Sequence, residues 1–361
     1  MSELACWLWL RAVLGPGARG MGELLALYGS PSEVQRAVGR EDFSSLLTSA
    51  QSARLTAAPR SFEALQSDCR RLGVQLIAYD EAAYPPRLKA IDDAPPVLFC
   101  TGDASALNAP HTVGMIGSRR PSAYGVEAAA ALGDALAGAG VCLVSGLADG
   151  LDSEAHRAAL RQNAPTVGVL GTSIDKTYPA ANRTLRRQME AVGAVISEYA
   201  PGEATGQPSF LQRNRLIAAL SDALCVVEAR EKSGTMNTVS HAIRYGRPVY
   251  AVPGGIFSEL CGGTNQLLAE GRARAVQTPA LFLQVLGLTA AKPSKHAAKP
   301  TTKLLSREAE AMLKGMASTP CSLEILAGRA ELTAPQALAA LLELEMADLA
   351  VALAGGQYRR K

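Results

Sequence analysis

Between about residue 76 and residue 285, short apolar runs alternate along the chain with longer amphipathic stretches. The apolar runs are rich in β-branched side chains, which predicts strands at residues 112–116, 141–145, 166–170, 194–197, 223–227 and 248–252. The stretches between them predict helices at residues 123–139, 152–162, 180–192, 210–221 and 235–245. Near-continuously apolar strands that alternate with helices are typical of a buried parallel sheet with helices on both faces. We therefore predict an α/β fold with a doubly wound, mostly parallel sheet.

The segments ahead of this region follow other patterns. Two extended pieces, "VQLIAY" and "PVLFCTG", precede the first of these strands, and we expect them to extend the sheet edge. Residues 1–75 read as short helices, and "LGPGARGMGELLALYGS" carries two glycine-rich turns, which predicts a small SAM or helix-hairpin-helix-like helical domain. Such turns either bind DNA phosphate through backbone N–H groups or only connect helices, and the turn motif alone does not decide.

The segments after residue 285 form two further parts. Residues 286–303, "LGLTAAKPSKHAAKPTTK", hold four lysines, two prolines and no acidic residue, which is typical of a flexible basic linker. Residues 304–361 show helix patterns at 307–316, 322–330 and 333–346, followed by the hairpin-like end "DLAVALAGGQYRRK". Three helices and a hairpin predict a winged-helix-like domain.

Composition narrows the class of protein. Hydrophobic residues make up 48% of the chain and charged residues 19%, which is typical of a soluble globular protein. No apolar run approaches ~20 residues, so we expect no membrane span, and the apolar N-terminal patch lacks the basic start of a secretory signal. Seven scattered cysteines and four separated histidines fit reduced thiols in a cytoplasm better than disulfides or a metal site. We expect no cofactor and no metal.

The distribution of charge limits where a polyanion could bind. Formal net charge is only +3. Residues 1–75 hold 8 basic and 7 acidic residues, residues 76–285 hold 18 and 19, and residues 286–361 hold 10 and 7. The largest segment is slightly acidic, so a polyanion site must be a local groove.

The carboxyl ends of the predicted strands carry the candidate chemistry. In open parallel sheets ligands bind beyond these ends, where helix N-termini present free N–H groups. The loops that follow the strands contain glycine turns, cations and amides: "GSRR", "GLADGLD", "GTSIDK", "PGEATGQPSFLQRNR" and "EAREKSGTMNT". Their order and repetition along one edge favour a ligand with an extended phosphate chain over a single nucleotide.

Four arginines, Arg119, Arg120, Arg213 and Arg215, are predicted at helix starts. A cation there faces the positive end of the helix dipole and is unfavourable by ~0.3–1 kcal/mol, so an anionic ligand is expected to compensate it. The alternative is local ion pairing with Glu198, Glu203, Glu228 or Glu231. Phe210 beside these arginines could stack on bases, although its position at the start of an amphipathic helix by itself favours a core residue.

Motifs for bond-breaking chemistry are missing from the sequence. It contains no G-x-x-x-x-G-K-[ST] segment, and no acidic pair or Ser/His/Asp order stands out. His156 and His241 fall within predicted helices as lone residues, which favours packing or surface roles. We therefore predict a binding protein and not an enzyme.

Five segments together resemble a known family: "MIGSRRPSAYG", "LVSGLADGLDSEAH", "VLGTSIDKTYPAAN", "ISEYAPGEATGQPSFLQRNRLIAALSDALCVVEAREKSGTMNTVSHAIRYGRPVYAVPG" and "LLAEGRARAV". Over roughly residues 79–276 they are similar, in the same order, to the DNA-processing protein DprA (Smf) family. The resemblance implies an extended Rossmann-like domain that binds single-stranded DNA, forms homodimers and protects incoming DNA. It further implies loading of the recombinase RecA in natural transformation or repair, with single-strand-binding protein as another candidate partner.

The resemblance also implies which residues contact DNA. The arginine of the family's GSR turn matches Arg119, and the glycine loop matches residues 146–152. The expected DNA-binding set is Ser118, Arg119, Gly146, Gly150, Asp152, Lys176, Asn182, Phe210, Arg213, Asn214, Arg215, Lys232, Ser233 and Gly234. The chain departs from the family pattern at Thr172, Ser173 and Gln207, and the similarity to the family is weakest in the loop after the third strand.

The sequence leaves two alternative functions. A nucleoside-monophosphate phosphoribohydrolase resembles this chain in fold but uses a G-T-x-x-E turn with a catalytic glutamate, where this sequence has "GTMNT" ending in Thr238. A purely structural DNA-compacting protein fits poorly with so small a net charge.

The predicted winged helix lacks the charge of a DNA reader. Residues 333–356 contain no Lys or Arg, whereas Glu343, Glu345 and Asp348 are acidic and would repel phosphates. We expect a protein-interaction or accessory role for this domain.

Overall fold

The computed structural model describes residues 2–17, 19–59, 62–289, 305–317, 319–346, 349–353 and 356–360. The chain divides into two compact units, residues 1–291 and 292–361. Most of the predicted basic linker and the acidic residue Asp348 lie outside the described residues. The finer division into four parts remains a prediction.

Within the described residues, nine strands of the first unit form one sheet in the order β1-β2-β6-β5-β4-β3-β7-β8-β9. Their bounds are β1 Gln75–Ala78, β2 Val97–Gly102, β3 Thr112–Ile116, β4 Cys142–Ser145, β5 Thr166–Val169, β6 Ala194–Ser197, β7 Ala223–Val226, β8 Val249–Ala251 and β9 Arg274–Ala275. All pairs from β6 across to β9 are parallel, whereas β1 and β2 add an antiparallel edge. The doubly wound, mostly parallel sheet is confirmed, and the two extended pieces do extend its edge.

The strand order places a switch point beside β3. The chain builds outward from β3 to β6 and then returns to pair β7 with the other side of β3. Two crossovers therefore leave the carboxyl ends of β3 and β7 in opposite directions and leave a crevice between them. Such a crevice is where open α/β sheets bind their ligands.

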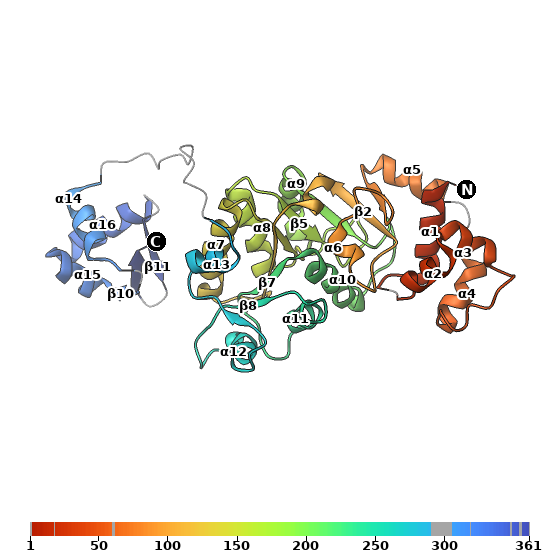
Figure 1. Cartoon of the computed structure of the whole chain (residues 1–361). Helices are drawn as coiled ribbons and strands as arrows, with labels where there is room; N and C mark the ends of the chain where they lie inside the picture. Colours follow the sequence, from red (N-terminus) through yellow and green to blue (C-terminus); the bar gives the residue numbers. More distant parts are fainter. Residues whose placement is uncertain are drawn as a thin grey trace. The chain divides into compact units, whose positions relative to one another are not determined.

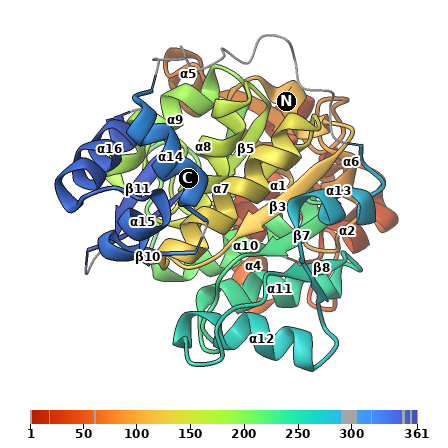
Figure 2. The ribbon, with the colours of Figure 1, turned by 90° about the vertical axis from the view of Figure 1, so that its left-hand side faces the viewer.

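Helices cover both faces of the sheet. The connecting helices are α6 Pro86–Lys89, η1 Ala104–Asn108, α7 Ala123–Gly138, α8 Leu151–Arg161, η2 Ala180–Asn182, α9 Arg183–Glu190, α10 Gln207–Leu220, α11 Gly234–Arg244, η3 Glu259–Cys261, α12 Gly262–Ala269 and α13 Pro279–Val285. Helices α7 and α8 lie side by side, as do α10 and α11 (Figure 1, Figure 2). Helix α10 starts earlier than predicted because Pro208 fits a first helical turn, where no N–H partner is needed.

Alternating side chains of the central strands β3, β4 and β7 supply two different cores. Met115 of β3 belongs to a buried cluster with Leu132 of α7 and Ala155 of α8. Val144 of β4 belongs to a larger cluster that includes Leu216 of α10. Since successive side chains of a strand point to opposite faces, this alternation fixes the register of a sheet buried on both sides.

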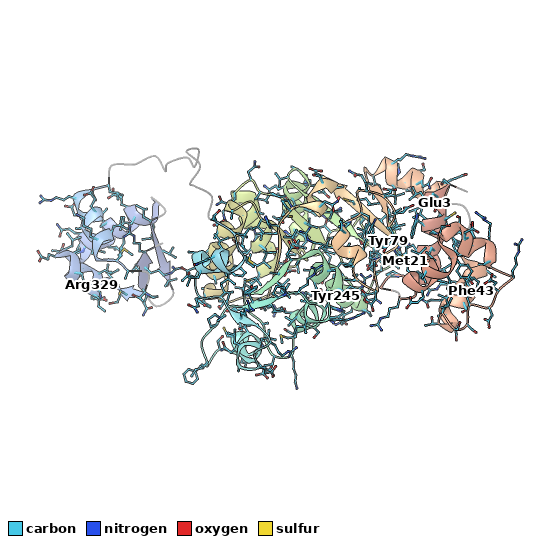
Figure 3. All side chains as sticks on the ribbon, in the orientation of Figure 1. Glu3, Met21, Phe43, Tyr79, Tyr245 and Arg329 are labelled. Carbon is cyan, nitrogen blue, oxygen red and sulfur yellow. The ribbon has the colours of Figure 1, made fainter. Side chains whose placement is uncertain are left out.

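Five helices precede the sheet: α1 Glu3–Leu14, α2 Met21–Tyr28, α3 Pro31–Ala37, α4 Ser49–Ala57 and α5 Glu63–Arg71. Their apolar side chains join the larger core of the sheet. Trp7 of α1 lies 5.7 Å from Tyr79, measured between ring centroids. Met21 of α2 belongs to the same hydrophobic cluster, against which Tyr79 packs; Figure 3 labels both residues. The helical segment is thus packed on the sheet through a continuous hydrophobic core.

The second unit has its own core and its own small sheet. It consists of α14 Arg307–Gly315, β10 Cys321–Ser322, α15 Leu323–Ala330, α16 Ala334–Met346, β11 Ala350–Leu353 and β12 Gln357–Arg360. The strands pair in the order β10-β12-β11, and Met312, Leu326 and Leu341 are buried between the helices. The predicted winged-helix fold is confirmed.

The buried side chain of His156 makes the free energy of unfolding depend on pH. The ring of His156 is fully buried, with Nδ1 2.7 Å from Thr166 Oγ1, which itself donates to Leu143 O, while Nε2 has no partner. Burial lowers the pKa of His156 from 6.5 to about 3, because protonation would bury an unpaired donor. The unfolded chain binds this proton first, so stability present above pH 6.5 is lost as pH falls toward 3, by up to about 1.4 kcal/mol per pH unit.

This loss is measured by urea unfolding across that pH range. We expect His156→Gln to lose this part of the acid slope, whatever its effect on absolute stability. His111→Gln, at an exposed position, serves as the control and should keep the wild-type slope. Equal slopes in wild type and His156→Gln would contradict the assignment.

Candidate nucleic-acid interface

A groove of about 930 Å³ lies at the switch point of the sheet. Its walls come from the loops after β3, β4, β5, β6 and β7, from α10 and from the start of α11. Nine of the predicted site residues line it: Ser118, Arg119, Asp152, Lys176, Phe210, Arg213, Asn214, Ser233 and Gly234. The strand-end loops that the sequence singled out therefore do converge on one surface.

Two glycines press the loops after β3 and β4 together. A Cβ on Gly117 would lie 2.3 Å from the side chain of Leu151, and one on Gly150 would lie 2.3 Å from Ser118 O. Gly150 also has a φ of +75°, which disfavours any other residue. The Leu151 N–H donates to Ser118 O at 3.1 Å. Gly150 therefore allows the two loops to pack closely. The tight turn after β3 leaves the side chain that follows Ser118, that of Arg119, exposed to solvent.

Arg119 is exposed on this turn, and its guanidinium carbon lies 5.8 Å from the ring centroid of Phe210. Within the part of the chain that the structure describes, no carboxylate lies at ion-pair distance from Arg119 or Arg120. The alternative of local pairing thus fails for both arginines. A cation near an aromatic face remains available for an anion in the groove.

Arg213 is buried and holds α10 against the ends of β4 and β5. Its Nη1 donates to Gly146 O at 2.6 Å and to Val169 O, the carbonyls at the ends of β4 and β5. Burial lowers the pKa of Arg213 to about 10; the carboxylate of Asp152 opposes this shift, and the charge of Arg119 adds to it. Two cations therefore lie close enough to repel each other.

Asp152 supplies the negative charge of this cluster. It is buried in the first turn of α8 and accepts a hydrogen bond from the Gly146 N–H at 3.1 Å. Burial raises the pKa of Asp152, and the charge of Arg213 counteracts that rise. Its carboxylate balances Arg213 and orders the glycine loop.

Arg215 does not line the groove. Its side chain is 3% exposed and forms an ion pair with Glu198, so the alternative of local pairing is confirmed for this arginine. The main-chain oxygen of Glu198 accepts from Arg11 Nη2 at 2.6 Å, and Glu198 Oε1 accepts from the Gly17 N–H at 3.4 Å. Arg215 therefore connects α10 to the N-terminal helices instead of to a ligand.

Two aromatic rings, those of Phe210 and Tyr178, line the groove. Phe210 is half-buried and lies outside the hydrophobic clusters, so the interpretation of Phe210 as a core residue is wrong. Its ring centroid lies 5.3 Å from that of Tyr178, whose side chain is 57% exposed. The sequence prediction missed Tyr178, although an aromatic two residues after Lys176 in a strand-end loop was an available signal.

The remaining predicted residues lie around the groove. Gly146 lines a small adjoining cavity, and Lys232 is exposed next to Ser233 on the rim. Asn182 is buried and donates to Leu147 O and to Ser153 Oγ, both at 3.0 Å, so it supports the loop after β4. Arg230, which was not predicted, lines the groove beside an exposed partner, Glu259.

The turn at the start of α11 carries no acid. Thr235 Oγ1 donates to Gly117 O at 3.2 Å, and Asn237 Oδ1 accepts from Asn214 Nδ2 at 3.2 Å. Thr238, at the position where the phosphoribohydrolase pattern has its glutamate, is buried. This turn holds loops together and offers no group that could serve as a general acid or base.

Comparison with known proteins agrees with this geometry. A sequence model described as DNA recombination-mediator protein A matches residues 75–287, and a DprA winged helix domain matches residues 296–356. The chain belongs to the DNA recombination-mediator protein A family. It is 33% identical over 319 residues to Protein Smf of Escherichia coli strain K12, covering 87% of this chain and 85% of that one.

Solved structures of family members share the fold. DNA processing protein A from Streptococcus pneumoniae superposes with a TM-score of 0.64 at 28% identity, covering 76% of this chain and 95% of that one. The protein from Helicobacter pylori superposes with a TM-score of 0.54 at 32% identity, covering 59% and 95%. The latter structure is described as showing a single-stranded DNA binding mode.

Two kinds of site, membrane-spanning and metal-binding, are absent from the described residues. No helix among them combines the length and apolar character that crossing a bilayer requires. No group of three or more His, Cys, Asp or Glu side chains among them is arranged to hold a metal ion.

The buried ion pair between Arg215 and Glu198 predicts a large effect of substitution on stability. Arg215→Met leaves Glu198 buried without its cation, so we expect a loss of about 3–5 kcal/mol in the free energy of unfolding, measured by urea titration. Arg215→Met combined with Glu198→Leu should lose less than the single variant, because both charges are gone. Arg36→Met, which breaks an exposed pair with Glu33, should cost at most about 1 kcal/mol. A similar small cost for Arg215→Met would show that the buried pair is dispensable.

Proposed function

We propose that this chain binds single-stranded DNA in the groove at the switch point and acts as a recombination mediator without catalytic activity of its own. The observation that carries the proposal is the succession of Arg119, Phe210 and Tyr178 across the groove. A cation next to two accessible aromatic rings matches what a single strand presents, phosphates alternating with unpaired bases.

Charge in the groove supports a polyanionic ligand. The lining residues include four cations and one carboxylate: Arg119, Lys176, Arg213, Arg230 and Asp152. This excess of three positive charges lies in a segment whose totals are 18 basic and 19 acidic residues. The positive charge is therefore local, as expected for a groove that follows a phosphate backbone.

Each side of the groove offers a different kind of contact. Arg119 and Lys176 are exposed and can reach phosphates, and the first turn of α11 adds free N–H groups at Ser233 and Gly234. Phe210 and Tyr178 offer ring faces to bases of any identity, so binding is expected to tolerate sequence. Arg213, Asp152 and Asn182 act from beneath by fixing the loops.

The nucleotide-enzyme alternative lacks its central residue. Asp152 is the one carboxylate among the groove's lining residues that the structure describes, and it faces Arg213 and the glycine loop. A hydrolase would need a carboxylate poised at the turn that holds Thr238. Release of free base from a nucleoside monophosphate by the pure protein would favour the enzyme over the mediator.

The wider role rests on family membership. We propose that the chain protects single strands, forms a homodimer and loads RecA recombinase onto DNA in natural transformation or repair, with single-strand-binding protein as a further candidate partner. The winged-helix unit supports a protein contact: α16 exposes Leu338 and Leu342, and its Glu343 accepts from Ser306 in the same unit. An apolar helix face without cations suits a protein partner better than phosphates.

Arg119 gives the first test. Arg119→Ala should weaken binding to oligo-dT by at least tenfold and flatten the salt dependence, since log K falls by about 0.7 per log unit of salt for each phosphate contact on a single strand. Fluorescence anisotropy over a salt series measures both. Arg120→Ala, the adjacent exposed arginine, should change each quantity far less. Equal behaviour of the two variants, or unchanged affinity in Arg119→Ala, would count against this groove.

Phe210 gives the second test. Phe210→Ala should lose about 1–3 kcal/mol of binding free energy for oligo-dT, the value of one stacked base. It should lose little for an abasic sugar-phosphate oligomer, which has nothing to stack. Phe257→Ala, which removes a 96% exposed ring outside the groove, serves as the control. Equal losses on both oligomers would mean that Phe210 only supports the fold.

A further inference from the structure

A second groove, of about 860 Å³, adjoins the first at its Tyr178 end. The two share Thr172, Lys176 and Tyr178 among their lining residues. The second groove continues over the loop after β5 and along α9, and its far wall is formed by residues 72–74 and the end of β2. A strand that leaves the first groove past Tyr178 would enter this one directly.

Three exposed cations line the second groove: Lys176, Arg183 and Arg187. Arg183 and Arg187 are four residues apart on α9, so their side chains lie on the same face of the helix. In the described ranges, none of the three has a carboxylate at ion-pair distance. Their charges are therefore available to a ligand.

The other charged residues of the lining, Arg186, Glu190 and Asp175, form hydrogen bonds within the protein. Arg186 is buried and donates to Ile174 O at 2.7 Å and to Glu190 Oε1 at 2.8 Å, which fixes α9 against the loop after β5. Glu190 Oε1 also accepts from Thr101 at 2.6 Å, and Asp175 accepts from the Gly202 N–H at 3.0 Å. Glu190 is thus paired with Arg186, and Asp175 keeps its negative charge near Lys176. The described lining residues still include four cations, Lys176, Arg183, Arg186 and Arg187, against these two carboxylates.

We infer that this second groove extends the path of single-stranded DNA, with Arg183, Arg187 and Lys176 binding the phosphates that follow Tyr178. The inference rests on the proposed function of the first groove. Among its described lining residues the second groove has one aromatic, Tyr178, at the shared border. It therefore binds backbone without stacking bases, and its contribution grows with strand length and falls with salt.

The test compares oligo-dT strands of increasing length, from about 4 to about 16 nucleotides, the range of site sizes known for single-strand-binding domains. Wild-type affinity should rise with length until both grooves are filled. The double variant Arg183→Ala/Arg187→Ala should bind the shortest strands within about twofold of wild type but lose about tenfold or more on long strands. Its salt slope on long strands should fall by about 1.4, the value for two phosphate contacts on a single strand.

A matched control removes the same charge elsewhere. Arg40→Ala/Arg274→Ala also deletes two exposed arginines, both outside the two grooves, and should bind all lengths like wild type. Thermal unfolding checks that each double variant is folded. Long-strand binding at the wild-type level in Arg183→Ala/Arg187→Ala, or equal losses at all lengths, overturns the inference while leaving the first groove intact. Unchanged binding in Arg119→Ala would instead overturn the proposed function itself.

Discussion

The buried guanidinium of Arg213 is the contact on which the geometry of the groove depends. It joins α10 to the carbonyls that end β4 and β5, so the helix is fixed at the edge of the sheet where the ligand crevice opens. A hydrogen bond to a charged group contributes about 1.5–3 kcal/mol, and Asp152 offsets part of the cost of burying the cation. The helix fixed in this way carries Phe210, whose ring centroid lies 5.8 Å from the guanidinium carbon of Arg119.

Helix α10 carries side chains to two different places. Near its start Phe210 faces the groove, and farther along Arg215 pairs with Glu198, whose main-chain oxygen accepts from Arg11 of α1. The N-terminal helices and the groove are therefore supported by the same helix. The helical segment also shares its hydrophobic core with the sheet.

Much of the fold could be predicted from the sequence. Short β-branched runs located β3 to β8 to within a residue or two, because strands buried on both faces must be apolar throughout. The loops that follow these strands indicated the correct edge of the sheet, because the carboxyl ends of parallel strands lie at the same edge. Periodicity does not show how deeply a side chain is buried. It placed Arg213 and Arg215 at a helix start, which is wrong: α10 begins at Gln207, so both lie in the middle of the helix, and both are buried. Tyr178 was not included in the predicted DNA-binding set because a single aromatic residue in a loop has no periodic pattern, and its ring gains its role from Phe210, which is distant in sequence.

The position of bound DNA is the most direct measurement of the central claim. Single strands carrying a photoreactive 5-iodouracil, crosslinked to the full chain and mapped by peptide sequencing, report which side chains lie against the bases. Crosslinks at Tyr178 and Phe210, lost when Arg119 is replaced by alanine, are the expected result. Crosslinks confined to the winged-helix unit, or to the exposed Phe257, would contradict the assignment of the groove.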